Sequence, residues 1–77
     1  MTDQEILDFK VGDQTIREMT AITFLHWLAK KIDNSSAYSA QIVELTMAIS
    51  APPVGQQMEE SGKVELVNKL LRAGITL

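Results

Sequence analysis

The chain has 77 residues, of which 45% are apolar and 22% are charged, and its formal net charge is −3. This composition is typical of one small globular domain and excludes a disordered tail or a membrane-embedded chain. The acidic balance, with Lys30-Lys31 as the only adjacent basic pair, argues against nucleic-acid binding, because no patch exists to replace phosphate counterions.

The sequence also argues against an exported or a membrane-inserted protein. No apolar run reaches the ~18–20 residues of a membrane-spanning helix, and the N-terminus is acidic where a signal peptide would be basic. The chain has no cysteine, which removes disulfides and thiolate metal sites and fits a cytoplasmic location. A domain of this size buries only ~60% of the surface of its unfolded chain, so we expect self-association to add stability.

The first predicted element is a β-hairpin. Leu7, Phe9 and Val11 alternate with polar residues, and Gly12-Asp13 permits a tight two-residue turn before a second strand over 14–19. A competing interpretation is helical, because the N-terminus also contains a pair with capping-box spacing, Thr2 and Glu5.

The register of this hairpin can be tested on both of its faces. The two-residue turn places Phe9 opposite Ile16, which is an apolar pair. It also places Asp8 opposite Arg17, which is a pair of opposite charge on the other face. Both faces are therefore consistent with the same register.

The second predicted element is an amphipathic helix over 21–33, with Thr20 as its N-cap. Its apolar arc contains Ala21, Ile22, Phe24, Leu25, Leu28, Ala29 and Ile32. His26 and Lys30 lie on the opposite, polar arc. Trp27 falls beyond the apolar edge, on the flank, and is the one large residue out of place.

The third predicted element is a helix over 37–50 with two apolar stripes. One stripe contains Tyr38, Ile42, Leu45 and Ile49, and the other contains Ala40, Val43 and Met47. A helix that is apolar on two faces is expected to be sandwiched between partners. We therefore expect the protein to form a homo-oligomer.

The chain continues through a connector and a last helix. Pro52-Pro53 cannot extend the preceding helix, so an extended connector is predicted before a helix over 62–73 that Ser61 caps. Gly74 is placed to end that helix in a left-handed conformation, with Ile75 making the accompanying apolar contact.

These elements predict one mainly α domain, with a short N-terminal β-hairpin followed by a three-helix bundle. Its parts are the hairpin (1–19), two helices (20–50), the Pro-Pro connector (51–61) and the C-terminal helix (62–77).

The residues with chemical potential do not form a catalytic pattern. His26 is the only histidine, it has no metal-ligand spacing, and we interpret it as solvated or structural. Glu59-Glu60 would be a paired carboxylate, but neighbouring residues point in different directions, so a solvated linker is the simpler interpretation. No serine elbow or glycine-rich phosphate loop is present. We expect no enzyme activity, no metal and no cofactor.

Three apolar residues are the candidates for binding a partner. Trp27 is either covered within the fold or an interface anchor. Val43 and Met47 are either core contacts of the sandwiched helix or part of an association surface that includes a flexible methionine.

The segment FKVGDQTIREMTAITFLHWLAKKI, residues 9–32, resembles the start of small phage tail-assembly chaperones. It combines a short strand, a turn, a second strand ending in a Glu-hydrophobic-Thr step, and an amphipathic helix that carries Trp-Leu. The resemblance implies a non-enzymatic helical viral protein that shields the tape-measure protein and helps tail-tube subunits assemble through exposed apolar helix surface. Trp27, Val43 and Met47 would be the matching surface. The Pro-Pro connector and the last helix have no counterpart in this resemblance.

The leading hypothesis is therefore a non-enzymatic protein-binding or assembly protein that acts on a partner's apolar helix. One alternative is a small phage-type inhibitor or anti-defence protein that blocks a host complex through an acidic face made of Asp3, Glu5, Asp8 and Asp13. Another is a small-ligand binder with a pocket between subunits, whose polar candidates are His26, Lys30 and Tyr38.

Overall fold

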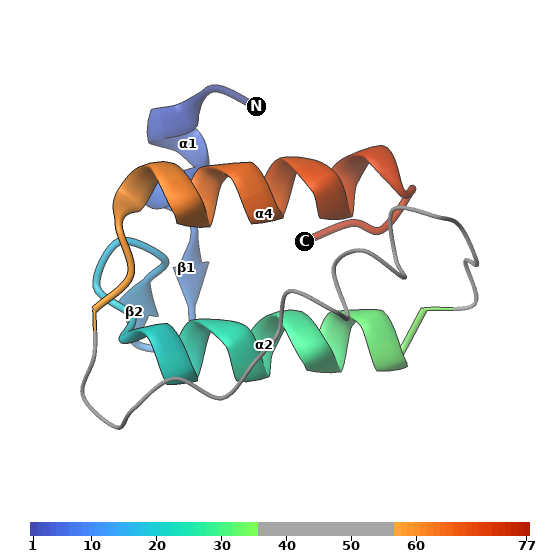
Figure 1. Cartoon of the computed structure of the whole chain (residues 1–77), viewed down its shortest axis with the longest axis horizontal. Coiled ribbons are helices and arrows are strands. Elements are labelled where there is room, and N and C mark those ends of the chain that lie inside the picture. The colour runs from blue at the N-terminus through green and yellow to red at the C-terminus, as the bar shows by residue number, and fades with distance from the viewer. Residues whose placement is uncertain (36–56) are drawn as a thin grey trace.

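The computed structural model describes residues 1–35 and 57–77 (Figure 1). The elements in these ranges are α1 (Asp3–Leu7), β1 (Lys10–Val11), β2 (Gln14–Thr15), α2 (Ala21–Asp33) and α4 (Glu60–Arg72). The described part is mostly helical with a short two-stranded antiparallel hairpin, as predicted. The expected helix over 37–50, with Tyr38, Val43 and Met47, and most of the Pro-Pro connector lie outside the described residues.

The N-terminal segment contains both of the structures that competed in the sequence. Thr2 and Glu5 form a capping box: the Thr2 side chain accepts a hydrogen bond from the Glu5 N–H, and the Thr2 N–H donates to Glu5 Oε1 at 2.9 Å. This box starts the single turn of α1, which takes Leu7 into a helix rather than a strand. The hairpin therefore occupies less of residues 1–19 than expected.

The hairpin has the predicted turn and the predicted register. Val11 pairs with Gln14 across the turn, where Gly12 has a φ of 66°, a left-handed conformation that glycine adopts without strain. The Ile16 N–H donates to the Phe9 carbonyl at 3.0 Å, which continues the same register beyond the strands. Arg17 contacts the Asp8 carboxylate, so the expected ion pair on the other face is also confirmed.

The helix α2 begins and ends where the sequence predicts. The Thr20 side chain accepts a hydrogen bond from the Thr23 N–H, which satisfies an N–H that has no partner within the helix. Phe24 and Leu28 are fully buried, in agreement with the apolar arc, whereas Ile22 is only half-buried.

The helix α4 begins at Glu60, two residues before the predicted start, and Glu59 is its N-cap in place of Ser61. Glu60 Oε2 accepts a hydrogen bond from Arg17 Nε at 3.2 Å, so the first turn of α4 is tied to the end of the hairpin. A carboxylate in the first turn also suits the positive end of the helix dipole. These two favourable interactions explain why the helix starts earlier than a serine cap predicts.

The two long helices run in the same direction, with their first turns at the end of the molecule that holds the hairpin (Figure 1). One buried apolar cluster joins them to α1 and to the segment after the hairpin. Its members are Ile6, Leu7, Ile16, Met19, Phe24, Leu25, Leu28, Val64, Val67, Leu70 and Ile75. Within the described ranges, no helix is both long enough and apolar enough to cross a bilayer.

The end of α4 is a Schellman motif centred on Gly74. The Gly74 N–H donates to the Leu71 carbonyl at 3.0 Å, and the Ile75 N–H donates to the Leu70 carbonyl at 3.3 Å. Gly74 has a φ of 87°, and Ile75 is buried in the core that also contains Leu70. The predicted stop and its apolar contact are both confirmed.

A lysine that the sequence did not single out is buried inside the fold. Lys63 is only 1% exposed, and its Nζ donates to the carbonyls of Ile16 at 2.8 Å, Arg17 at 3.1 Å and Met19 at 2.7 Å. These bonds use all three donors of an ammonium group. Burial lowers the pKa of Lys63, and the Glu60 carboxylate acts in the opposite direction.

We expect Lys63→Met to destabilise the protein by ~3 kcal/mol or more, because three carbonyls lose a donor and a buried polar group without a partner costs ~1–3 kcal/mol. Urea unfolding followed by circular dichroism measures the loss. Arg72→Met is the matched control on the same helix, since Arg72 is an exposed basic residue at the end of α4. Equal midpoints for the two variants would show that the Lys63 bonds do not hold the fold together.

We expect Gly74→Ala to destabilise the protein by about 1–2 kcal/mol, the cost of a left-handed conformation in a residue with a Cβ. No atom lies within 4 Å of the added Cβ, so the cost comes from the backbone alone. Gly62→Ala, inside α4, should instead stabilise the protein by about 0.5–1 kcal/mol, because its Cβ would meet only Met58 Cγ at 3.5 Å and Sδ at 3.8 Å. Thermal unfolding of both variants measures these opposite signs, and a destabilised Gly62→Ala would contradict the contrast.

We expect Glu18 to titrate below its ordinary pKa of 4.5. The Thr15 N–H donates to Glu18 Oε1 at 2.8 Å and the Thr15 hydroxyl at 3.0 Å, and these bonds lower the pKa of Glu18. Their contribution to stability is present above the ordinary pKa and is lost as the pH falls through the lowered value. An NMR titration of the carboxyl carbon measures the shift, and Thr15→Val should raise the pKa part of the way back. An unshifted Glu18 in the wild-type protein would be inconsistent with these bonds.

Candidate functional site

Trp27 is half-buried on the flank of α2, where the sequence places it. Its ring packs against the buried Phe24, with 6.0 Å between the ring centroids and a tilt of 35°. Lys31 Nζ lies 6.0 Å from the centroid of the Trp27 ring, close enough for a cation–π contact. Part of the indole therefore belongs to the fold and part of it remains at the surface.

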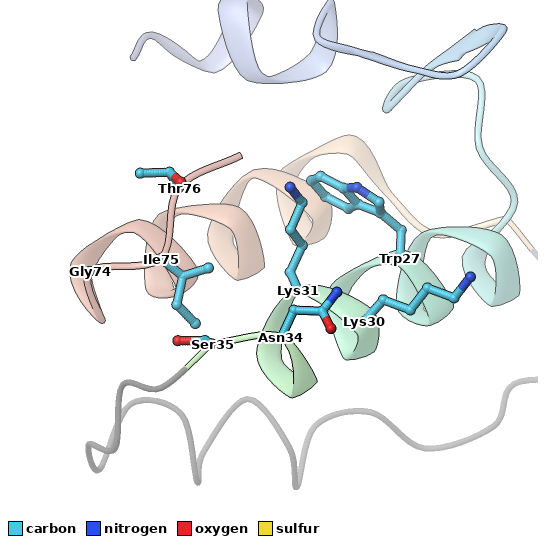
Figure 2. A pocket seen from close by; sticks show the side chains of 8 residues that line it. All are labelled: Trp27, Lys30, Lys31, Asn34, Ser35, Gly74, Ile75 and Thr76. Atoms are coloured by element: carbon cyan, nitrogen blue, oxygen red, sulfur yellow. The ribbon is translucent and has the colours of Figure 1, made fainter.

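The first hollow beside Trp27 lies between the end of α2 and the chain that follows α4. It has a volume of about 560 Å³ and is lined by Trp27, Lys30, Lys31, Asn34, Ser35, Gly74, Ile75 and Thr76. Figure 2 shows Trp27 and Lys31 extending together from α2, with Ile75 on the segment that returns from α4. The Schellman motif produces this return, because it turns the chain back toward the core.

The second hollow lies on the other side of Trp27, between α2 and the hairpin. It has a volume of about 290 Å³ and is lined by Val11, Gln14, Met19, Thr23, His26, Trp27 and Lys30. Trp27 and Lys30 line both hollows. We call the surface formed by these two hollows the Trp27 face.

The two lysines of the Trp27 face have different surroundings. Lys31 is half-buried, and its Nζ donates to the main-chain oxygen of Leu77 while lying over the indole. Lys30 is exposed and extends in a different direction from Lys31 (Figure 2). Both are in the last turn of α2, where cations compensate the negative end of the helix dipole.

Of the other candidate residues that the structure describes, His26 also lines the Trp27 face, whereas Glu59 and Glu60 do not. His26 is exposed and lines the second hollow, but the described residues contain no group of three histidine, cysteine, aspartate or glutamate side chains that could hold a metal. Glu59 and Glu60 lie at the start of α4, not in a solvated linker, and Glu60 is paired with Arg17. Val43 and Met47 lie outside the described residues.

The acidic face that would serve an inhibitor is partly used within the fold. Asp8 is paired with Arg17, and the Glu5 carboxylate accepts the Thr2 N–H, which lowers the pKa of Glu5. Asp3 and Asp13 are exposed. Two of the four predicted carboxylates are therefore satisfied by partners in the same chain.

The sequence did not indicate that the chain after α4 lines the site. Ile75 and Thr76 reach the Trp27 face because the helix ends in a Schellman motif, which the sequence did predict. The signal for the motif was present, but its consequence depends on how α4 lies beside α2.

Comparisons with known proteins return no relative. No family model matches the chain, and no match is found among curated proteins or solved structures. The resemblance to phage tail-assembly chaperones therefore stays a prediction from residues 9–32. We infer function from the residues and contacts alone.

Proposed function

We propose that this chain is a non-enzymatic protein-binding or assembly protein, and that its partner contacts the Trp27 face. The observation that carries the proposal is the position of Trp27 as the shared wall of two adjacent hollows. Tryptophan is enriched among the residues that dominate binding energy at protein interfaces, because its ring offers a large rigid surface with a polar N–H. A half-buried indole between two hollows suits that use.

The chemistry of the same surface favours binding over catalysis. Among the described residues that line it, the titratable side chains are His26, Lys30 and Lys31. The Lys31 ammonium group already donates to the Leu77 main-chain oxygen and lies over the Trp27 indole. Thr23 lines the second hollow together with His26, but its hydroxyl is hydrogen-bonded to the Thr20 hydroxyl at 2.9 Å. The described lining residues include no carboxylate that could pair with a base for acyl transfer or hydrolysis.

The specific form that we propose is a phage-type tail-assembly chaperone, which shields an apolar helix of its partner until assembly. The resemblance over residues 9–32 supports this form, and these residues include the hairpin, α2 and Trp27. Self-association through the two apolar stripes expected within 37–50 remains a prediction, since those stripes lie outside the described residues.

We expect Trp27→Ala to lose its partner while it keeps its fold. Trp27 is half-buried, so its truncation should cost less than the ~3–5 kcal/mol of Phe24→Ala, which removes a fully buried ring. Thermal unfolding by circular dichroism compares the two variants, and a pull-down from the native host lysate measures partner capture on the same samples.

Leu66→Ala is the control for the pull-down. Leu66 is also half-buried and packs against the core, but it lines neither hollow. Leu66→Ala should capture the same partner as the wild-type protein. Loss of the cooperative unfolding transition in Trp27→Ala, or equal capture by Trp27→Ala and wild type, would defeat the proposal.

A further inference from the structure

The described residues of the Trp27 face carry a charge opposite to that of the whole chain. The chain has ten acidic and seven basic residues, and Glu44 is the only acidic residue outside the described ranges. None of the acidic residues within the described ranges lines either hollow, whereas Lys30 and Lys31 line the first and Lys30 and His26 line the second. Asp33 is exposed at the end of α2 but lines neither hollow.

The apolar and basic groups of the face lie next to each other. Trp27 and Ile75 are the apolar side chains of the first hollow, and Val11 and Met19 join Trp27 in the second. Lys30 borders both hollows and is exposed, so its ammonium group is available to a carboxylate beside the indole. Lys31 already has the Leu77 oxygen as a partner.

We infer that the Trp27 face binds an acidic peptide segment of a partner protein, with an apolar anchor side chain against Trp27 and a carboxylate on Lys30. This inference rests on the proposed function and adds the chemistry of the partner. Complementary charge at the rim of such a site speeds association and selects among partners, while the buried anchor supplies most of the affinity.

Two other occupants fit the observations less well. A free inorganic anion would meet the negative end of the α2 dipole, which the two lysines already compensate, and it would leave the apolar walls uncovered. A second copy would have to present carboxylates of its own, and three of them, Glu5, Asp8 and Glu60, are engaged within the fold. That contact would also join different surfaces of the two copies and extend into open chains unless the geometry closed a ring.

The test uses a displayed library of random peptides of about 12 residues. Peptides that bind the full chain are kept, and those that also bind the Trp27→Ala variant are discarded. Trp27 is the only tryptophan of the chain, so its emission reports the binding of peptides that lack tryptophan. Lys30→Glu is the test variant. Lys10→Glu is the matched control, because Lys10 is also exposed, lies on β1 and lines neither hollow.

The expected result is enrichment of peptides that combine aspartate or glutamate with a large apolar residue. Their Kd, measured from Trp27 emission, should rise about tenfold in Lys30→Glu and less than about twofold in Lys10→Glu, as reversal of a rim charge predicts. Their affinity for the wild-type protein should also fall as salt is added.

Three results would overturn the inference. Neutral or basic peptides that depend on Trp27 would overturn the acidic partner and leave the proposed function standing. A dimer that forms through Trp27 in sedimentation equilibrium, with no peptide enriched, would replace the acidic partner with a second copy. No enrichment and no Trp27-dependent association would overturn both the inference and the proposed function.

Discussion

The arrangement of this small fold depends on one buried ammonium group. Lys63 comes from α4, and the three carbonyls that it bonds belong to the segment between the hairpin and α2. Burying a charge is costly, and the cost is offset only where the group keeps a full set of hydrogen bonds. The three hydrogen bonds of Lys63 form together only when α4 takes one position relative to that segment. The apolar contacts of the core are less directional, so we infer that Lys63 fixes where they form. The Arg17 contacts with Asp8 and Glu60 lie at the surface near the same place and support the same position.

The parts of the fold that sequence analysis predicted are those whose cause is local. The turn at Gly12, the cap at Thr20 and the stop at Gly74 each depend on residues a few positions apart, and each is present. The two competing interpretations of the N-terminus were both partly correct, since a capping box and a two-residue turn fit into one short segment. Lys63 was not predicted, because a lysine in an amphipathic helix is ordinarily exposed and its partners are backbone carbonyls more than forty positions away.

The candidate site also has one feature with a local cause, which the sequence predicts, and others that depend on distant segments. The flank position of Trp27 follows from helical periodicity, which is a local property. Its two hollows do not, because each needs a segment from elsewhere: the hairpin supplies Val11 and Gln14, and the chain after α4 supplies Ile75. The positive charge of the Trp27 face could likewise not be predicted from the sequence, because the net charge of the whole chain is −3. It appears only when the acidic residues are seen to lie on other parts of the described surface.

A half-buried tryptophan combines a contribution to folding and a contribution to binding, and the two are difficult to separate in a domain of only 77 residues. A partner that binds only the folded state adds to its stability, so a variant that loses binding also loses apparent stability in the presence of that partner. In this chain, Phe24 supplies most of the contribution to folding, and we assign the contribution to binding to the neighbouring Trp27. Phe24, one turn before Trp27, is fully buried and contributes its ring to the core, with 6.0 Å between the two ring centroids. Because Phe24 provides the apolar contact at the centre of the core, α2 does not need the whole of the indole for folding, and the exposed part of the Trp27 ring is available for a partner.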